Sequence, residues 1–160
     1  MIIRPAGLAD ANAIWAVLEP TIRAGETYTL PREMEKDQAL AYWFAPEHTV
    51  LVAEQDGEVI GTYYLRANQK GGGSHVANCG YMTATGATGR GVATAMCEHS
   101  LEYARSQGFL AMQFNIVVSS NQAAVHLWEK LGFAAVGRVP NAFLHPRLGY
   151  VDALVMYRTL

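Results

Sequence analysis

A glycine-rich segment in the middle of the chain, Thr85–Thr94, constrains the fold more than any other part of the sequence. It holds three glycines and runs directly into a long helical pattern. The first N–H groups of a helix have no partner within the helix and lie at the positive end of its dipole, so such a segment forms an anion site. Glycine lets that backbone approach a phosphate closely, and Arg90 could add a charge at the rim. Because several strand-like segments precede it, the segment does not fit a nucleotide fingerprint that follows a first strand.

The residues before this segment predict one strand, two helices and a three-stranded meander. Apolar residues recur at intervals of three and four from Leu8 to Arg23, which is typical of a helix with one buried face. The pair Asp56-Gly57 is a signal for a two-residue hairpin turn, and Lys70–Ser74 is expected at the tip of the next hairpin. The expected elements are strands Ile2–Arg4, Thr49–Glu54, Glu58–Arg66 and His75–Ala84 and helices Leu8–Arg23 and Arg32–Phe44.

Two further helices and three strands are expected after the segment. Glycine followed by phenylalanine, at Gly108-Phe109 and Gly132-Phe133, marks the ends of both helices, as in a common helix stop. The expected elements are helices Gly91–Gln107 and Asn121–Leu131 and strands Leu110–Val118, Ala134–Val139 and Tyr150–Thr159, with a long loop Pro140–Gly149 between the last two.

The order of these elements predicts a mixed α+β sheet. An antiparallel meander leads into a parallel crossover that begins at the glycine-rich segment, and this order differs from the strict alternation of a doubly wound fold. The 160 residues are expected to form a single domain over 1–160 with a sizeable core.

The composition excludes several classes of partner. A net charge of −2 gives no electrostatic basis for binding nucleic acid or an anionic membrane. The two cysteines, Cys79 and Cys97, are too few for a disulfide framework and are expected as reduced thiols. The N-terminal residues do not form a signal peptide, and no apolar run is long enough to span a bilayer, so we expect a cytoplasmic protein.

Two motifs, in the right order and at the right separation, resemble the GNAT acetyltransferase superfamily, and the resemblance covers nearly the whole chain. The segment Thr88-Gly89-Arg90-Gly91-Val92-Ala93 is similar to the pyrophosphate signature of the family, although Thr88 stands where the family has Arg or Gln. The segment Asn121–Phe133 is similar to the family motif Asn-x-x-Ala-x-x-Leu-Tyr-Glu-Lys-x-Gly-Phe. The resemblance implies a mostly antiparallel sheet of about seven strands flanked by four helices, with a V-shaped splay between the central strands.

The resemblance also implies transfer of an acetyl group from acetyl-CoA to an amine within a ternary complex, without a metal. The amides from Gly89 to Thr94 are expected to hold the pyrophosphate, and the pantetheine arm is expected to pair with the strand that carries Tyr81. A backbone N–H near Met82 is expected to polarise the thioester carbonyl. The residues expected to bind acetyl-CoA are Tyr81, Met82, Thr83, Thr88, Gly89, Arg90, Gly91, Val92, Ala93, Thr94, Asn121, Ala124, Leu127 and Trp128.

Three asparagines, Asn78, Asn115 and Asn121, are the candidate catalytic residues. An amide side chain donates and accepts hydrogen bonds without adding charge, which suits a small zwitterionic acceptor, and Asn121 is a candidate donor to the sulfur or the oxyanion. Together with Val139–Phe143 and Gly149–Ala153, they resemble the branch that contains the yeast azetidine-2-carboxylate N-acetyltransferase, which acts on proline analogues. The residues expected to bind the acceptor are Asn78, Asn115, Glu26, Tyr28 and Phe143.

Trp128 occupies the position at which the family often carries a tyrosine acid. An indole N–H is a donor only and a very poor acid, so a general-acid tyrosine does not carry over to this chain. A thiolate whose thiol has a pKa of about 8.5 can leave without a protein acid. Glu26 could orient the amine or relay its proton through water, and an ordinary solvated glutamate is the alternative.

Other functions stay open on the sequence alone. The acceptor could instead be a protein N-terminus or a phosphinothricin-like amino acid. A non-catalytic acyl-CoA sensor is the alternative from another class. The late strands and the loop Pro140–Gly149 could also form a homodimer interface, although nothing in the sequence requires one.

Overall fold

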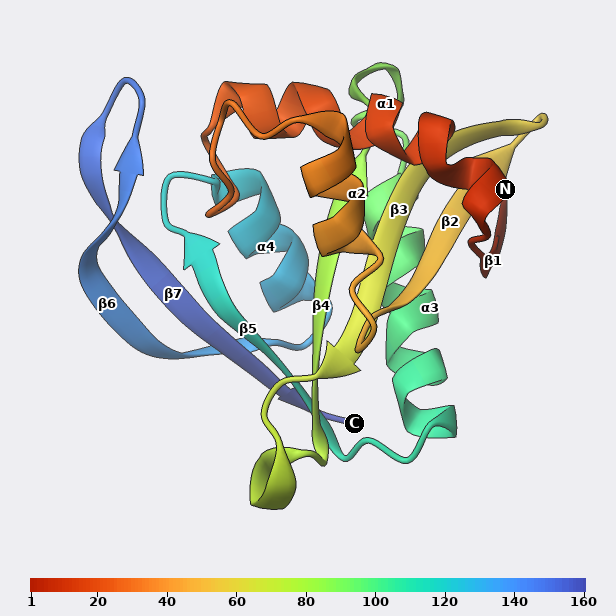
Figure 1. Ribbon diagram of the computed structural model, residues 1–160. Helices are drawn as coiled ribbons and strands as arrows, with labels where there is room; N and C mark the ends of the chain where they lie inside the picture. Colours follow the sequence, from red (N-terminus) through yellow and green to blue (C-terminus); the bar gives the residue numbers. More distant parts are fainter.

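One seven-stranded sheet, in the order β1-β2-β3-β4-β5-β7-β6, runs through the computed structural model, which describes residues 1–160 (Figure 1). The strands are β1 Ile2–Pro5, β2 Thr49–Gln55, β3 Glu58–Ala67, β4 Val76–Thr83, β5 Ala111–Val118, β6 Ala134–His145 and β7 Gly149–Thr159. The helices are α1 Ala11–Ala24, α2 Lys36–Trp43, α3 Val92–Ser106 and α4 Gln122–Lys130. The predicted order of elements and the mixed α+β class are confirmed. Nowhere does the fold contain a helix with the length and hydropathy of a transmembrane span.

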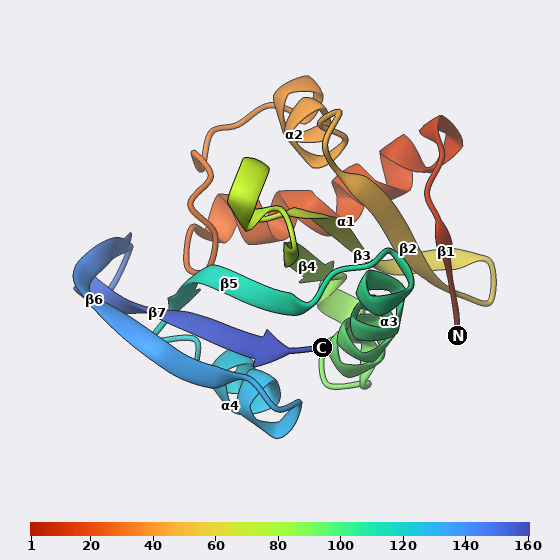
Figure 2. The same ribbon diagram turned by 90° about the horizontal axis from the view of Figure 1, so that it is seen from below.

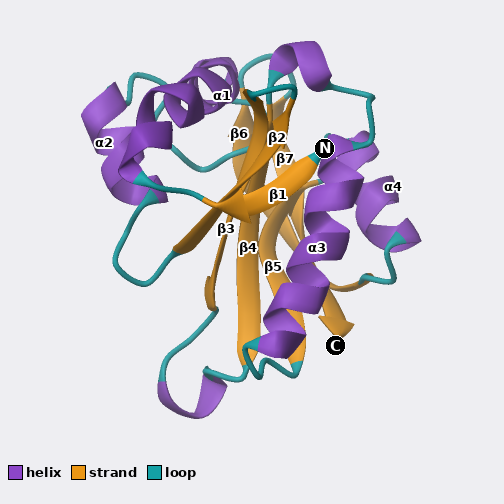
Figure 3. Cartoon of the chain, turned by 90° about the vertical axis from the view of Figure 1, so that its right-hand side faces the viewer, coloured by secondary structure: helices purple, strands orange, loops and turns teal.

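The helices cover both faces of the sheet, with α1 and α2 on one side and α3 and α4 on the other (Figures 2 and 3). Each face has its own apolar core. Ile14, Leu18 and Trp43 pack on the first face together with Met82, whereas Met96 and Leu101 belong to the core of the second. Because side chains alternate along a strand, β4 contributes Met82 to one core and Cys79 to the other.

The central strands β4 and β5 are parallel neighbours that pair only at one end. Their register covers Val76 with Ala111 and Ala77 with Met112, and beyond these residues the strands diverge in a V (Figure 1). At the point where they separate, the side-chain Nδ2 of Asn78 donates to the carbonyl oxygen of Gln113 at 2.9 Å. The Asn78 side chain therefore pairs with a main-chain carbonyl that would have bonded to β4 if the two strands had stayed together. The predicted splay between the central strands is present.

Several turn signals produce the expected geometry. Asp56 and Gly57 have φ angles of 53° and 82°, as a two-residue hairpin turn of the favoured type requires. The segment Gly71–Gly73 forms a short 3-10 turn at the tip of the β3–β4 hairpin. Both predicted helix stops are present, since Gly108 and Gly132 each adopt a φ of 87°.

The second helix begins four residues later than predicted. Residues 31–34 form a turn, in which the N–H of Met34 donates to Pro31 at 3.0 Å. Arg23, near the end of α1, donates to the Met34 carbonyl at 2.8 Å and so satisfies it outside any helix. The capping side chains are Glu35 and Gln38, which fix the helix start at Lys36.

The predicted loop Pro140–Gly149 is wrong, because β6 continues as far as His145. The register of β6 and β7 shifts between Val139 and Phe143, which is a bulge that contains Pro140 and Asn141. Asn141 has a φ of 52°, and its N–H donates to the Asp152 carboxylate at 3.0 Å. The carboxylate supplies the acceptor that the disrupted ladder lacks, so the strand tolerates the proline.

Candidate active site

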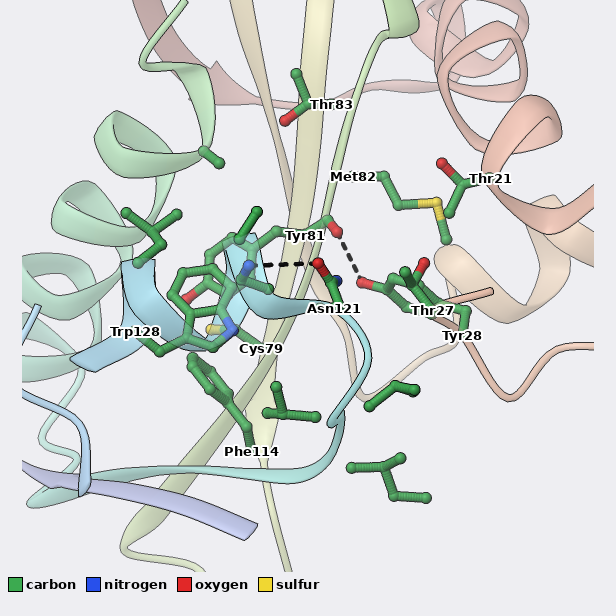
Figure 4. Close-up of a pocket in the computed structure, with 18 of the residues that line it drawn as sticks. Thr21, Thr27, Tyr28, Cys79, Tyr81, Met82, Thr83, Phe114, Asn121 and Trp128 are labelled. Atoms are coloured by element: carbon green, nitrogen blue, oxygen red, sulfur yellow. Dashed lines mark hydrogen bonds between the residues drawn. The ribbon is translucent and has the colours of Figure 1, made fainter. Parts of the chain in front are cut away.

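A cleft of about 750 Å³ opens where β4 and β5 diverge, with lining residues from all four helices (Figure 4). Most residues predicted for the site lie on its wall: Tyr28, Asn78, Tyr81, Met82, Thr83, Thr88, Gly89, Gly91, Val92, Ala93, Thr94, Asn115, Asn121, Ala124, Leu127 and Trp128. Arg90, Glu26 and Phe143 do not line it.

The main chain of β4 faces the cleft at alternate residues. The N–H of Ala84 donates to Ile60 of β3 and the carbonyl of Val76 accepts from Asn68, so even-numbered residues turn their main chain toward β3. The main-chain groups of Tyr81 and Thr83 consequently face the splay, where β4 has no strand partner. The expected N–H near Met82 is therefore that of a neighbouring residue, since the main chain of Met82 itself is paired with Thr62.

The glycine-rich segment ends in an open helix start. Gly89 and Gly91 both have a φ of 79°, a conformation that disfavours residues with a Cβ, and the position of each missing Cβ faces open space. No side chain caps α3, and its first main-chain bond runs from Ala95 to Gly91 at 3.0 Å. The N–H groups of residues 92–94 are thus left without partners at the positive end of a helix of 15 residues.

Arg90 turns away from this anion-binding geometry. Its Nη2 donates to the side chain of Gln55 at 3.3 Å, beside the β2–β3 turn. Gly89 and Gly91, which flank Arg90, line the cleft, whereas Arg90 does not. The geometry therefore does not support the expected charge at the rim of the cleft.

The three candidate asparagines differ in which atoms are free. Asn78 is 8% exposed and uses Nδ2 to hold Gln113, which leaves Oδ1 as an acceptor without a donor. Asn121 caps α4, because its Oδ1 accepts the N–H of Ala124 at 3.3 Å, and its Nδ2 has no partner. Figure 4 shows Asn121 directed into the cleft from the start of α4.

Asn115 has neither atom free. Its Nδ2 donates to Asn68 at 2.7 Å, and its Oδ1 accepts from Gln113 at 3.1 Å. It lines the cleft on β5, where each of its polar atoms already has a side-chain partner. Asn78 and Asn121 are therefore the members of the trio that offer unpaired groups.

Tyr28 connects the segment after α1 to the exposed side of β4. Its hydroxyl donates to the carbonyl oxygen of Tyr81 at 2.9 Å (Figure 4). Burial raises the pKa of the Tyr28 hydroxyl, so it stays protonated and remains a donor. Tyr28 thus closes one side of the cleft and does not supply a proton near neutral pH.

Glu26 and Phe143, both expected to contact the acceptor, are held elsewhere. Glu26 forms an ion pair with Arg147 in the β6–β7 turn. Phe143 is 8% exposed and pairs with Val151, because the extended β6 places it inside the sheet and not in a loop. The geometry does not bring either residue to the cleft.

Trp128 forms part of an aromatic wall. Its ring centroid lies 5.2 Å from that of Tyr81 and 5.1 Å from that of Phe114, and the side chain is 8% exposed. The hydroxyl of Tyr81 points away from the splay to Ser100, at 2.7 Å, and burial raises its pKa well above the usual range. Neither aromatic residue can donate a proton readily at neutral pH.

One charged residue of the cleft was not predicted from the sequence. Arg66 is the only charged side chain among the residues that line the cleft, and no Asp, Glu or His lines it. The alternation Thr62, Tyr64, Arg66 along β3, together with the antiparallel register to β4, places Arg66 opposite Asn78. That register is the signal from which the residue could have been found.

A family model and a solved structure both relate the chain to the same family of acetyltransferases. Residues 14–133 match the family model described as acetyltransferase (GNAT) family. The chain is similar to a solved GCN5-related N-acetyltransferase from Kribbella flavida, at 41% identity and a TM-score of 0.94, over 99% of this chain and 97% of that one.

Two further relatives are more distant. The N-acetyltransferase aca1 of Schizosaccharomyces pombe is 26% identical, over 84% of this chain and 72% of that protein. The yncA protein of Salmonella typhimurium, solved with its cofactor acetyl-CoA, is 24% identical, with a TM-score of 0.87 over 100% of this chain and 94% of that one. At this identity the second likeness shows the fold alone.

Proposed function

The chain belongs to the acetyltransferase (GNAT) family, and from that premise we propose that it transfers the acetyl group of acetyl-CoA to the amine of a small amino or imino acid. The observation that carries the proposal is the cleft itself. It joins an unpaired strand edge on β4 to an open helix start on α3, and amide side chains line its far side. We propose that residues 1–160 form one acetyltransferase domain.

The shape and donors of the cleft fit acetyl-CoA. The unpartnered N–H groups of residues 92–94, with those of Gly89 and Gly91, would hold the pyrophosphate. The N–H of Tyr81 and the main chain of Thr83 would offer hydrogen bonds to an extended pantetheine arm, and Ala124, Leu127 and Trp128 would supply an apolar wall beside it. We propose no metal for this chemistry.

The reaction forms one bond from the acceptor nitrogen to the acetyl carbon and breaks the bond from that carbon to sulfur. Asn78 Oδ1 would orient the amine, and a main-chain N–H of β4 would stabilise the oxyanion. Asn121 Nδ2 would donate to the sulfur as it leaves as a thiolate. Because no Asp, Glu or His lines the cleft, the amine proton leaves to water.

The polarity of the cleft supports the proposed acceptor class. The free amide atoms of Asn78 and Asn121, with aromatic rings on the α1 side, suit a small ring or side chain with polar groups at one end. Azetidine-2-carboxylate and other proline analogues have this form. A cationic polyamine would find no carboxylate there.

The two buried free thiols, Cys79 and Cys97, fit a reducing compartment such as the cytoplasm.

The test is thiol release from acetyl-CoA with a panel of acceptors. The panel holds azetidine-2-carboxylate, proline, linear amino acids, phosphinothricin, spermidine and an N-terminal peptide. We expect release above the amine-free blank with small amino or imino acids and none with spermidine. Acetylation of the peptide alone would redirect the proposal to a protein N-terminus. Tight acetyl-CoA binding without turnover on any acceptor would point to a sensor.

A homodimer through the last strands stays a prediction. The edge strand β6 exposes apolar side chains, with Val136 61%, Val139 47% and Leu144 60% accessible. A surface of this kind on an edge strand is typical of an interaction site. Sedimentation of the protein and of Leu144→Lys would test it, and a monomer at all concentrations for the unmodified protein would contradict it.

A further inference from the structure

We propose that Arg66 is the anion-binding residue for the acceptor, so that the enzyme selects amines that carry a carboxylate, or a similar anionic group, beside the nitrogen. The inference rests on the proposed function and narrows its substrate class. It concerns a different part of the cleft from the helix start of α3.

The first observation is an unpaired nitrogen of a charged side chain. The Nε of Arg66 is buried and has no hydrogen-bond partner, and it is the only buried side-chain nitrogen or oxygen in the structure in this condition. The nearest acid is Glu47, whose carboxylate lies 4.0 Å from Nη1 and is 60% exposed. A buried guanidinium nitrogen without a partner is unfavourable unless a ligand supplies the acceptor.

The second observation is the position of Arg66 within the cleft. It is the only charged residue that lines the cleft, and its ion-pair partner Glu47 lies outside the cleft lining. Arginine presents its donors in a planar fork that matches the two oxygens of a carboxylate. A carboxylate bound there would accept a hydrogen bond from the unpaired Nε of Arg66 and add a second negative charge beside the guanidinium.

The third observation is the pairing of Arg66 with Asn78. The two residues lie opposite each other across β3 and β4, and both line the cleft. Residues paired in this way have Cα atoms about 5.5 Å apart and side chains on one face. A cation therefore stands beside the free Oδ1 of Asn78, and an α-amino acid carries the complementary carboxylate and amine on a single carbon.

The coenzyme phosphates do not explain Arg66. The glycine-rich segment begins after Thr83, five residues beyond Asn78 along β4. At about 3.4 Å per residue, this separation is roughly 17 Å. The open N–H groups of α3 therefore serve one anion and Arg66 serves a second.

The experiment compares two acceptors with one ring, azetidine-2-carboxylate and azetidine, on the unmodified protein, Arg66→Gln, Arg66→Lys and the control Arg105→Gln. Arg105 is an exposed partner of Glu102 on α3 and lies outside the cleft. Thiol release gives kcat/KM, and calorimetric titration into the protein with CoA gives the affinity for each acceptor, which does not depend on turnover.

We expect the unmodified protein and Arg105→Gln to prefer the carboxylate acceptor in both measurements. Arg66→Gln should lose about 10- to 100-fold in kcat/KM and affinity for azetidine-2-carboxylate, the effect of losing a charge-assisted pair, and change little for azetidine. Arg66→Lys should recover part of the loss. CoA affinity should stay the same in every variant.

Each other outcome has a defined meaning. Equal losses for both acceptors, or an unchanged carboxylate preference in Arg66→Gln, would overturn the role of Arg66 while leaving acetyl transfer intact. Arg66-dependent binding of the carboxylate without thiol release would support the anion site and overturn the proposed reaction. No binding and no release with either acceptor would overturn both.

Discussion

Replacing Gly91 tests whether the start of α3 holds the coenzyme phosphates. Gly91 has a φ of 79° and open space at its Cβ position, so a new side chain meets backbone strain and no clash. A residue with a Cβ in this conformation costs about 1–2 kcal/mol. For a chain of this size we expect Tm to fall by about 2–8 °C in Gly91→Ala and Gly91→Glu alike.

The two variants should differ in coenzyme affinity. A carboxylate held about 4 Å from a phosphate costs about 1 kcal/mol per charge pair in water and about 4 kcal/mol at the effective dielectric of a protein surface. Gly91 is exposed, which favours the lower part of this range. We expect acetyl-CoA to bind Gly91→Glu roughly 5- to 30-fold more weakly than Gly91→Ala, as 1–2 kcal/mol implies.

The matched control is Gly108→Glu, at the other end of the same helix. Gly108 has a φ of 87°, is exposed and also has nothing near its Cβ position. It should lose a similar amount of stability and bind acetyl-CoA normally. Calorimetric titration at low and high salt measures the effect, and the difference between the Gly91 variants should shrink in 1 M salt, where the screening length is about 3 Å. Equal affinity of Gly91→Glu and Gly91→Ala at low salt would refute the assignment of the helix start.

Three further predictions concern single side chains. Asn121→Asp should keep the cap of α4 and the Tm but lose about 100-fold in kcat, because it removes the free Nδ2. Asn121→Ala should lose the same activity and, in addition, about 1 kcal/mol of stability. Equal kcat in the unmodified protein and both variants would exclude Asn121 as a catalytic donor. Tyr28→Phe leaves the Tyr81 carbonyl without its donor and should cost about 1 kcal/mol in urea unfolding, and an unchanged free energy of unfolding would show that water replaces the hydroxyl. Hydrogen bonds from Arg4 lower the pKa of Asp10 below 3.8. The contribution of the ionised Asp10 to the free energy of unfolding is therefore present above pH 4 and is lost as the pH falls through the lowered pKa. The difference in unfolding free energy between the unmodified protein and Asp10→Asn should therefore shrink as the pH falls below 4, and a difference that stays constant through an acid titration would contradict this.

Much of the fold was predictable because its signals are local. Alternating apolar residues, the Asp56-Gly57 turn and the glycine stops each depend on a few neighbouring residues, and all of these elements formed. The errors arose where distant residues decide. Arg23 holds the turn before α2, and Asp152 stabilises the bulge that extends β6, and neither contact is visible in a local pattern.

The candidate site shows the same division. Motifs were enough to locate the segment Thr88–Thr94 and the helix start at Asn121. The site residues predicted in these two regions all line one cleft, with the exception of Arg90. Glu26 was placed in the site by its position after α1, but its charge is satisfied by Arg147, more than a hundred residues later in the chain. Arg66 was not predicted from the sequence, because the observation that singles it out is an unpaired buried nitrogen, which only the three-dimensional arrangement reveals.

The short pairing of β4 with β5 has a consequence for how such a protein can change over time. Under the proposed function, the coenzyme occupies the place of an absent strand and is recognised largely by main-chain groups, which every amino acid supplies. Substitutions along β4 and at Thr88 can then accumulate without loss of coenzyme binding, provided that the backbone path is kept. The side chains on the opposite wall are free to diverge toward new acceptors, so that one scaffold can acquire different substrates while it retains the same donor.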